Sequence, residues 1–401
     1  GTVDDMFTQR KHYQKLMREE RNKGNTELAN KYDIIQYIKK ILLNSCYGSS
    51  ANPYFLFFKP EIASSITAMG QHAIKAVAER LNHVMNKLCG TITETYFEYD
   101  LTDFSNMTDD EITDFIVMGD TDSCAISFEP YVNKFLKGKS DEEILNHILD
   151  IHKDILTPEL DECLNNIQKE FNFYKKTLKL SLETITKKSI FLQKKRYLGH
   201  VVWDDGVVCL DYNEPHFKIK GVEGIKSSTS EYFQEKFMEF YKLCLLSNNN
   251  DEIRNYLKEV ENDYKKRYVM ESGKPVRIKN LEKYKCDKKI YKLGTPEATK
   301  GALIYNFFIK RFGLEKKYDL LRNEDYAVLM KLRANNGFTN INKQGVRVSE
   351  TVICIPSDSV LPPELKLDKH IDTDLQFSKF FKNPCLEIMK IMKISHIKFK
   401  S

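Results

Sequence analysis

Two carboxylates offer the first recognisable chemistry in this sequence. Asp120 and Asp122 stand at alternate positions in MGDTDS (118–123), between two strand-like apolar runs. This pattern predicts a β-hairpin with both carboxylates at its tip, where they can approach a divalent cation. Alternate positions of a regular strand point to one face, so the two side chains are expected on the same side.

A second polar group lies earlier in the chain, in KKILLNSCYG (39–48). Lys40, Asn44 and Tyr47 are spaced so that they share one face of a helix, which would present an ammonium, an amide and a phenol to a ligand. The apolar residues of the same helix fall largely on the other side and are expected to pack on the protein. They are Ile34, Ile38, Ile41 and Leu42.

Two basic segments favour phosphate binding. Residues 187–196 hold five basic residues and no acid, and a DDG turn signal (204–206) then predicts a hairpin whose entry strand starts with KKRY. The segment 216–230 combines two glycines and three lysines with a hydroxyl cluster, a composition that suits phosphate contacts from amides, lysines and hydroxyls.

The elements that would position these residues are mostly helical at the start of the chain. A basic helix over 7–21, stopped by Gly24, and a second helix from Glu27 to about Ser45, capped by Thr26, form an antiparallel helical hairpin. A third helix over 60–90 has apolar residues at helical spacing from Ile62 and Ile66 onward, which predicts core.

The remaining elements follow more weakly from the pattern. Helices are predicted in 141–170, 231–246, 251–268 and 302–312, and strands at 180–185, 326–332 and 346–356. Glu183 would lie near the centre of the strand 180–185. An acidic stretch at 91–113 is expected to be a loop or small insertion.

Composition sets limits on the class of protein. The 401 residues suffice for two or three domains, and a net charge of +5 permits a nucleic-acid partner without requiring one. Nine cysteines without a close pair argue against a local zinc or iron–sulfur site. No apolar run approaches the roughly 20 residues of a membrane span, so no membrane partner is expected. Because the chain opens on Gly1, a fragment or processed chain is expected.

In order along the chain, these motifs resemble the C-terminal part of family B DNA polymerases, and most of all the replicative polymerases of T-even-type bacteriophages. Besides NSCYG, GDTDS and KKRY, the resemblance includes segments found throughout the sequence. They are SSITAMGQ (64–71), NKLCG (86–90), PHFKIKGVEG (215–224), SST (227–229), LPPELK (361–366) and FSKFFKNP (377–384).

The resemblance implies an α+β fold with the right-hand architecture of polymerases. Fingers formed by a helical hairpin would occupy residues 1–50. An antiparallel-sheet palm would occupy 51–221, with the metal-binding hairpin around 115–128 and the KKRY hairpin at 191–211. A mostly helical thumb would occupy 222–401, and the N-terminal and exonuclease domains of the family would be absent.

The resemblance also implies roles for the carboxylates and for the helical face. Asp122 would bind two catalytic Mg²⁺ ions, with Asp120 as an auxiliary acid and Glu183 near the metals. Lys40 would contact the incoming dNTP and protonate the leaving pyrophosphate, while Arg10 holds the outer phosphates. Where the family has a further lysine this chain has Gln14, so Lys11 or Lys15 would take its place.

The remaining implied roles concern the base pair and the duplex. Asn44 and Tyr47 would line the nascent base pair, and Gly48 would let the backbone come close. The primer-template would be held by residues of the two basic segments. They are Lys194, Lys195, Arg196, Tyr197, Lys218, Lys220, Ser227, Ser228 and Thr229.

One essential motif of the family has no counterpart in the sequence. A second aspartate that bridges the same two ions lies before the fingers, in a DxxSLYPS-like segment, and DLTDFS (100–105) lacks that pattern. The acidic DxE segment of a proofreading exonuclease is missing as well. The chain is therefore expected to be one part of a DNA-directed DNA polymerase, inactive alone and completed by a second chain.

Two alternative functions share some of these features. A primer-template-binding module without catalysis would have little use for metal and triphosphate ligands. A reverse transcriptase shares paired aspartates on a hairpin tip, but the long paired helices and the KKRY and SST elements argue against it. A phage origin would place the protein in the cytoplasm of an infected bacterial host. Polymerases of the family often end in a short apolar tail that binds a sliding clamp, and the last residues of this chain, ISHIKFKS (394–401), match such a tail poorly.

Overall fold

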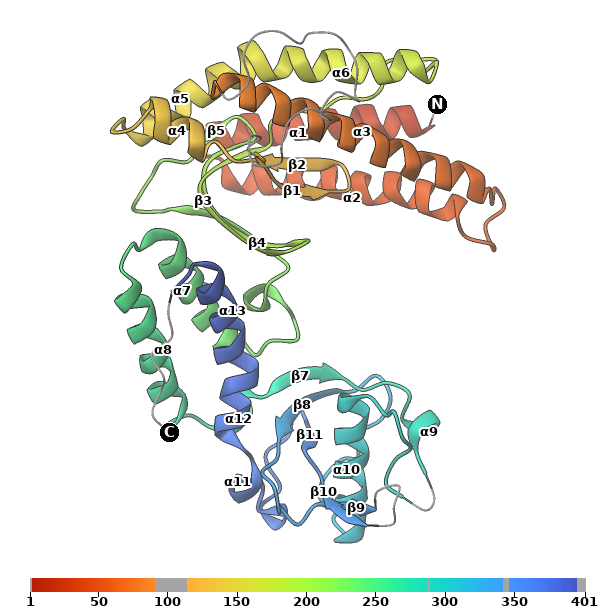
Figure 1. Cartoon of the computed structure of the whole chain (residues 1–401). Helices are drawn as coiled ribbons and strands as arrows, with labels where there is room; N and C mark the ends of the chain where they lie inside the picture. Colours follow the sequence, from red (N-terminus) through yellow and green to blue (C-terminus); the bar gives the residue numbers. More distant parts are fainter. Residues whose placement is uncertain (1, 91–113, 287–288, 342–345, 395–401) are drawn as a thin grey trace. The chain divides into compact units, whose positions relative to one another are not determined.

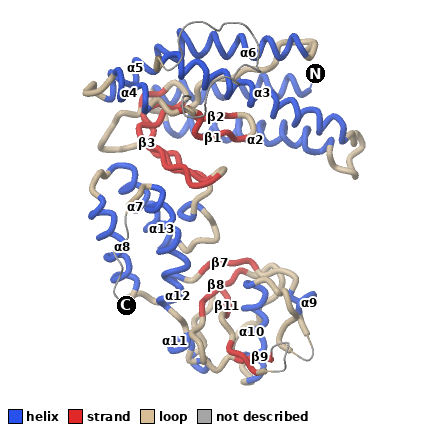
Figure 2. The backbone as a smooth tube through the Cα atoms, viewed as in Figure 1, coloured by secondary structure: helices blue, strands red, loops and turns tan. Residues whose placement is uncertain are grey.

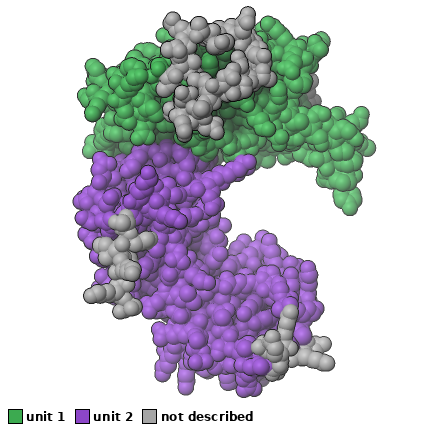
Figure 3. Space-filling model, viewed as in Figure 1, with its two compact units in different colours: residues 1–187, 200–216 green, residues 188–199, 217–401 purple. Residues whose placement is uncertain are grey.

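The computed structural model describes residues 2–90, 114–286, 289–341 and 346–394 (Figure 1). Helices and strands are mixed, as expected for an α+β protein. The chain forms two compact units, residues 1–187 with 200–216 (unit 1) and residues 188–199 with 217–401 (unit 2), shown in Figure 3. The acidic stretch 91–113 and its DLTDFS segment lie outside the described residues.

Unit 1 begins with the predicted helical hairpin, formed by α1 (Thr2–Asn22) and α2 (Thr26–Ser50). Gly24 ends the first helix with φ +76°, a conformation that glycine adopts without strain. The predicted cap Thr26 is wrong, because Asn25 caps α2 by accepting a hydrogen bond from the Leu28 amide (3.4 Å). The helix also runs beyond Ser45, so all of 39–48 is helical.

The long helix α3 (Pro60–Leu88) lies against α6 (Thr157–Glu170). Its C-terminal half buries Val77, Leu81 and Val84 in a core shared with α6. The core prediction is wrong for Ile62 and Ile66, because each of these side chains is 50% exposed.

The β-hairpin predicted around GDTDS is confirmed as β1 (Ile116–Asp120) and β2 (Ser123–Ile126), paired antiparallel. It packs on the C-terminal half of α3, where the Asn82 side chain accepts a hydrogen bond from the Phe115 amide (2.7 Å). Three helical segments follow before α6. They are α4 (Glu129–Phe135), α5 (Asp141–Ile151) and a π-helical turn (His152–Leu156).

A four-stranded sheet contains β3 (Thr184–Gln193), β4 (Arg196–Asp204), β5 (Val207–Val208) and β6 (His216–Lys220). The order is β3-β4-β5, and β6 also pairs with β4. The predicted strand 180–185 is wrong in its bounds, because β3 begins at Thr184 and Glu183 stands outside it. The DDG turn is confirmed: Asp205 and Gly206 have φ +49° and +98° and connect β4 to β5.

The first part of unit 2 is helical. Its main helices are α7 (Glu231–Leu246), α8 (Asn250–Tyr264) and α13 (Asn383–Ile391), preceded by α12 (Thr373–Phe377) and a π-helical segment (Ser378–Lys382). Stacked and tilted aromatic rings fill the core, among them Phe233, Phe237 and Phe381. Ser230 caps α7, and its hydroxyl accepts a hydrogen bond from the Phe233 amide (3.4 Å).

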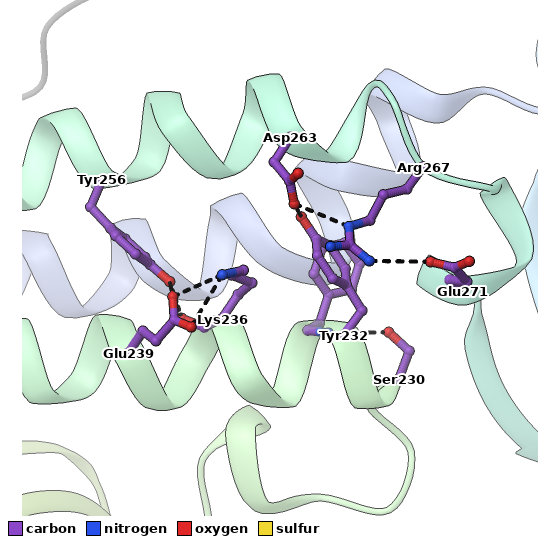
Figure 4. A network of polar contacts seen from close by, with 9 residues as sticks. Ser230, Tyr232, Lys236, Glu239, Tyr256, Asp263, Arg267 and Glu271 are labelled. Carbon is purple, nitrogen blue, oxygen red and sulfur yellow. Dashed lines mark hydrogen bonds and ion pairs between the residues drawn. The ribbon is translucent and has the colours of Figure 1, made fainter.

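Polar contacts join α7 to α8 along their exposed edge (Figure 4). Asp263 accepts hydrogen bonds from the Tyr232 hydroxyl (3.1 Å) and from Arg267 (3.0 Å), whose guanidinium also lies over the Tyr232 ring. Burial and the bond to Asp263 raise the pKa of Tyr232. The pair of helices is thus held by directional contacts in addition to the aromatic core.

The second part of unit 2 packs α10 (Glu297–Arg311) on a three-stranded sheet of order β11-β8-β7, whose strands and helices are coloured in Figure 2. Gly301 allows the close contact, because an added Cβ would lie 2.6 Å from the Cys354 sulfur. The strands are β7 (Lys274–Arg277), β8 (Tyr326–Lys331) and β11 (Val352–Pro356), with a separate pair β9 (Thr339–Ile341) and β10 (Arg347–Ser349). Short helices complete the unit: α9 (Leu281–Tyr284), α11 (Leu367–His370) and three 3₁₀ turns at 223–225, 269–272 and 363–365.

Candidate functional site

A tight turn connects Asp120 and Asp122 of GDTDS. Asp120 ends β1 opposite Ser123, while Thr121 (φ +54°) and Asp122 form the connection. The Asp122 amide donates to the Asp120 carbonyl (2.6 Å). The prediction that both residues share one face of a regular strand is therefore wrong, since Asp122 lies in the turn and its position depends on turn geometry.

The surroundings of the two carboxylates differ. Asp120 is partly buried, and its carboxylate accepts a hydrogen bond from the Thr121 hydroxyl (3.1 Å). Asp122 is exposed, and its carboxylate has no hydrogen bond or ion pair with any residue that the structure describes. The carboxylate of Asp122 is thus available to a ligand from outside the described chain.

The predicted polar face of α2 is exposed. Lys40, Asn44 and Tyr47 all reach solvent, and their side chains have no hydrogen bond or ion pair within the described ranges. The expectation for the opposite face is wrong. Ile34 and Ile38 are 61% and 50% exposed, and Ile41 and Leu42 are exposed as well, so α2 buries only Ala29 among its described side chains.

Arg10 of α1 and Lys40 of α2 lie on opposite helices of the hairpin. Lys39 donates a hydrogen bond to the Gln9 side chain (2.7 Å), which places Gln9 and Lys39 side by side on the two antiparallel helices. The Arg10 Nε is buried and has no hydrogen-bond partner among the described residues. An unsatisfied buried donor of this kind is rare in folded proteins and can be satisfied by an anion.

The two lysines expected to assist Arg10 make contacts within α1. Lys15 pairs with Glu19 (3.8 Å), and Lys11 lies 5.6 Å from the centre of the Phe7 ring. Both are exposed, so neither contact would hold the lysine strongly. The geometry does not distinguish which of them would replace the lysine expected at Gln14.

The donor set for a metal ion is incomplete within the described residues. Asp120 and Asp122 offer hard oxygen ligands of the type that Mg²⁺ takes. No three His, Cys, Asp or Glu side chains in the described part of the chain are grouped to hold a metal ion, so Glu183 does not join the two aspartates in such a group. Glu183 is exposed, and its carbonyl accepts from the Asp205 amide (2.8 Å). Asp120 and Asp122 are ligands of the type that Mg²⁺ prefers, but a complete site would need further ligands.

The KKRY segment forms the tip of the β3–β4 hairpin in unit 2. Lys194 and Lys195 are exposed in the turn, where Lys195 has φ +64°. Arg196 is partly buried and pairs with Glu223 (3.1 Å) and Glu387 (3.3 Å), so its charge is neutralised within the unit. The exposed positive charge of the segment therefore lies on the two lysines.

The second basic segment lies against this tip. Gly221 has φ +64°, and a Cβ added there would stand 2.2 Å from the Lys195 carbonyl oxygen, so only glycine fits. Of the neighbouring lysines on β6, Lys220 is exposed and Lys218 partly buried. The KKRY turn and the segment around Gly221 are separate in sequence but lie next to each other. Lys194, Lys195, Lys218 and Lys220 of these two segments are called the basic surface below.

The hydroxyl cluster is held in place by a glutamine. The Gln234 side-chain amide donates to the Lys226 carbonyl (2.9 Å) and to the Thr229 carbonyl (3.0 Å). Between these two anchors, Ser227 and Ser228 are exposed. The loop therefore has a fixed backbone with free hydroxyls at its surface.

A carboxylate limits the positive charge of this surface. Burial by itself would raise the pKa of Glu223, but the hydrogen bond from Lys226 (2.8 Å) and the charge of Arg196 lower it below its ordinary value. Glu223 is therefore ionised and neutralises part of the charge around it.

Sequence reasoning missed one contact in unit 1. Arg18 of α1 forms a bidentate pair with Asp205, through Nε to Oδ2 (2.7 Å) and a shorter contact from Nη2 to Oδ1. The only signal was the basic character of the first helix and the acidic DDG turn, and neither identifies the pair. This contact attaches the helical hairpin to the β4–β5 turn.

Comparison with known proteins agrees with the motif-based resemblance. The family model described as DNA polymerase family B matches residues 2–147. The chain is 25% identical over 361 residues to the DNA-directed DNA polymerase of Enterobacteria phage T4, covering 87% of this chain and 36% of that protein. The DNA-directed DNA polymerase of Escherichia phage RB69 is 28% identical over 223 residues (52% and 22%), and the DNA polymerase of Choristoneura biennis entomopoxvirus is 31% identical over 193 residues (45% and 18%).

The chain spans about a third or less of the length of these relatives. The similarity to family B DNA polymerases, and to those of T4-type phages in particular, is thereby confirmed. Separately, none of the helices in the described ranges is long and apolar enough to cross a membrane.

Proposed function

We propose that this chain, which resembles family B DNA polymerases, is the nucleotide-binding part of a DNA-directed DNA polymerase. It would add a nucleotide from a dNTP to a primer 3′-hydroxyl by a two-metal mechanism. The observation that carries the proposal is the unpartnered, exposed carboxylate of Asp122 on the GDTDS turn. The same compact unit presents Lys40, Asn44 and Tyr47 on α2.

The side chains of the helical hairpin suit a triphosphate. Lys40 and Arg10 contribute one positive charge from each helix of the hairpin, and the Arg10 Nε lacks a partner among the described residues. Lys40 would bind the phosphates and give a proton to the departing pyrophosphate, while Arg10 holds the outer phosphates. Such charges act most strongly where negative charge develops in the transition state.

The end of α2 would contact the nascent base pair. Asn44 and Tyr47 supply an amide and a phenol ring, and Gly48 follows them directly. A Cβ added at Gly48 would meet no atom within 4 Å, so the packing of the chain itself does not demand glycine there. Close approach of a ligand to the backbone accounts for the glycine.

Asp122 and Asp120 would hold Mg²⁺. When bound, two such ions make the 3′-hydroxyl nucleophilic and stabilise the departing phosphates. The two aspartates would hold the ions close to the dNTP, and Glu183 would act at a greater distance. Because bridging two ions generally takes more carboxylates than this pair, the site calls for a further acidic ligand.

A second chain would supply that ligand. The sequence holds no DxxSLYPS-like segment, and the T4 relative is matched over 36% of its length. We propose that the partner brings the missing aspartate together with the exonuclease and N-terminal domains. A sliding clamp is a further candidate partner of the whole polymerase. In domain terms, residues 1–50 would be fingers, 51–221 palm and 222–401 thumb.

The basic surface of unit 2 would hold the primer-template. Lys194, Lys195 and Lys220 are exposed at its centre, beside the free hydroxyls of Ser227 and Ser228. Tyr197, Lys218 and Thr229 would support these contacts, while Arg196 would act through Glu223. Binding through phosphates releases counterions, so affinity should fall steeply with salt.

Primer extension tests the proposal. The chain alone should bind primer-template DNA and extend no primer, and a mixture with the chain that carries the missing aspartate should extend with Mg²⁺. Asp122→Asn should abolish extension by the mixture while leaving DNA affinity unchanged, because the substitution removes a metal ligand outside the basic surface. Asp150→Asn changes another exposed carboxylate of unit 1 and serves as the matched control.

The second candidate is a primer-template-binding module without catalysis. One observation favours it: the described residues include no group of three metal-ligating side chains. Salt-sensitive DNA binding with no extension in any mixture would establish this reading. Robust extension by the purified chain alone would instead disprove the need for a second chain.

A further inference from the structure

A cavity of about 790 Å³ opens in the second part of unit 2. It is bordered by α9 and the residues that follow it, by the C-terminal half of α10, by the segment 315–323, and by β9 and β10 (Figure 1). None of the residues assigned above to metal, dNTP or DNA is among the described residues that line it. Its volume lies in the range of small-molecule sites, about 300 to 1,000 Å³.

Side-chain amides hold the walls of the cavity in place. Asn306 of α10 donates to the Leu321 carbonyl (2.8 Å) and accepts from the Leu321 amide (2.9 Å). The Asn323 side chain accepts from the Leu281 amide of α9 (2.8 Å). These bonds attach the segment 315–323 to both helices, so the cavity is formed before a ligand arrives. A preformed site loses less conformational freedom on binding.

The ring of Phe307 is exposed on the cavity wall. Phe307 is 40% exposed, whereas the adjacent Phe308 is 3% exposed, and the two rings meet in a T-shaped contact at 5.2 Å. The buried ring thereby fixes the orientation of the exposed one. Leu303 and Leu321 add buried apolar surface to the same cavity. A planar base can stack on an aromatic ring held in this way.

The cavity also carries an excess of positive charge. Among the described residues that line it, three are acidic and six are basic, the latter being Lys285, Lys289, Lys310, Arg311, Arg322 and Arg347. Lys310, Arg322 and Arg347 are exposed, and their side chains form no hydrogen bond or ion pair within the described ranges. Their charges are therefore available to an anion with several oxygen atoms, such as a chain of phosphates.

We propose that this cavity binds a nucleoside triphosphate. Its base stacks on Phe307, and its phosphates bind Lys310, Arg322 and Arg347. The inference goes beyond the proposed function, because these residues differ from those assigned to the incoming dNTP. The chain would thus have a second nucleotide site, built entirely within unit 2.

The acidic residues of the cavity favour a single nucleotide over a nucleic-acid strand. Glu282, Glu315 and Asp319 are exposed on its border. A strand carries phosphates along its whole length and would bring some of them close to these carboxylates, whereas a single nucleotide gathers its charge in one chain of phosphates. The carboxylates can then accept hydrogen bonds from ribose hydroxyls, as acidic residues do in dinucleotide sites.

The test measures ATP binding to the full chain by titration calorimetry without Mg²⁺, so that the proposed metal site stays empty. The charge variant Arg322→Ala/Arg347→Ala is compared with the control Lys316→Ala/Lys369→Ala. The control removes the same charge from exposed residues that do not line the cavity. Thermal unfolding checks that the fold is retained, which is expected because all four side chains are exposed.

ATP should bind in a 1:1 ratio, about 10-fold or more weakly to the charge variant and with unchanged affinity to the control. Equal affinity of the wild type and the charge variant would overturn the inference. The absence of ATP binding by the wild type would do the same.

Phe307→Ala tests the stacking of the base. It should weaken ATP binding by about 5-fold or more and leave the binding of inorganic tripolyphosphate unchanged, since that ion has no base. Phe312→Ala is the matched control, because Phe312 is 55% exposed at the end of α10 and does not line the cavity. An equal loss for ATP and tripolyphosphate would contradict the assignment of a nucleotide.

Two further measurements separate this cavity from other places where ATP could bind. Lys40→Ala should leave the affinity for ATP unchanged, and a loss would place the nucleotide at the helical hairpin of unit 1 and reject the second site. A short single-stranded oligonucleotide should displace ATP poorly. Displacement at lower concentration than unlabelled ATP requires would identify the occupant as a strand and also reject the proposal.

Discussion

Arg18 and Asp205 form a bidentate ion pair that joins the first helix to the β4–β5 turn across a long stretch of sequence. The two side chains are 44% and 35% exposed, which limits their electrostatic contribution, but the parallel hydrogen bonds fix their geometry. The pair therefore orients the helical hairpin of unit 1 relative to the sheet that follows. Nothing in the local sequence around either residue reveals it.

Removing either partner should destabilise unit 1 by about 1 kcal/mol. Arg18→Ala and Asp205→Asn, combined in a double-mutant cycle, measure the coupling, and Asn is chosen because it tolerates the left-handed φ of +49° at this position. Trp203, the one tryptophan of the chain, lies next to the turn and reports urea unfolding by fluorescence. Additive effects of the two variants would show that the pair contributes no coupling.

Lys40 should matter for the nucleotide and not for DNA. In the reconstituted mixture, Lys40→Ala should lower kcat/KM for the dNTP by about 10²- to 10³-fold, since a charge next to the developing pyrophosphate is lost. The dissociation constant for primer-template should stay unchanged. Lys31→Ala is the matched control, because Lys31 is also exposed on α2 but lies half a helical rotation away from Lys40. Equal effects of the two variants would refute a specific role for Lys40.

Gly221→Ala should displace the KKRY tip. The substitution adds a Cβ that would stand 2.2 Å from the Lys195 carbonyl oxygen, on a backbone with φ +64°, so we expect a loss of roughly 1–3 kcal/mol in stability and weaker DNA binding. Gly294→Ala is the control: its φ is +76°, but an added Cβ would meet nothing within 4 Å. Gly294→Ala therefore reports backbone strain alone. Fluorescence anisotropy with labelled primer-template compares the two variants.

Asp141 should make the stability of unit 1 sensitive to acid. Burial alone would raise the pKa of Asp141, but hydrogen bonds from Lys187 and Tyr212 outweigh it and lower the pKa below its ordinary value. A carboxyl with a lowered pKa stabilises the fold above its unfolded pKa of about 3.9, and this stabilisation is lost as the pH falls through the folded pKa.

The matching experiment compares Asp141→Asn with the wild type. The variant should be less stable at neutral pH, and the difference in urea midpoint should shrink as the solution is acidified below about pH 4. Tyr212→Phe removes one of the two donors and should give a smaller difference with the same direction. A difference between wild type and Asp141→Asn that does not depend on pH would contradict the assignment.

Local pattern was enough to predict the elements that carry the candidate site. The helices α1, α2 and α3 and the GDTDS and DDG turns all follow from signals within a few residues, since periodicity and turn composition act over that distance. The motifs in their order also predicted the family resemblance, which the comparisons confirm. The roles of individual site residues remain predictions.

Boundaries and burial were predicted less well, for a physical reason. The start of β3 at Thr184 and the exposure of Ile62 and Ile66 depend on which distant segments pack against these residues, and periodicity does not identify those segments. A helical stripe predicts an apolar face, while its burial requires a partner.

By itself, the sequence predicted candidate residues for binding metal, triphosphate and DNA, from residue type, short spacing and the family resemblance. Only the tertiary structure decided which of them are available. It pairs Arg196 with Glu223 and Glu387, leaves Asp122 without a partner among the described residues, and joins Arg18 to Asp205. Pairing and exposure are set by side chains that meet across long sequence separations, and those meetings are a property of packing.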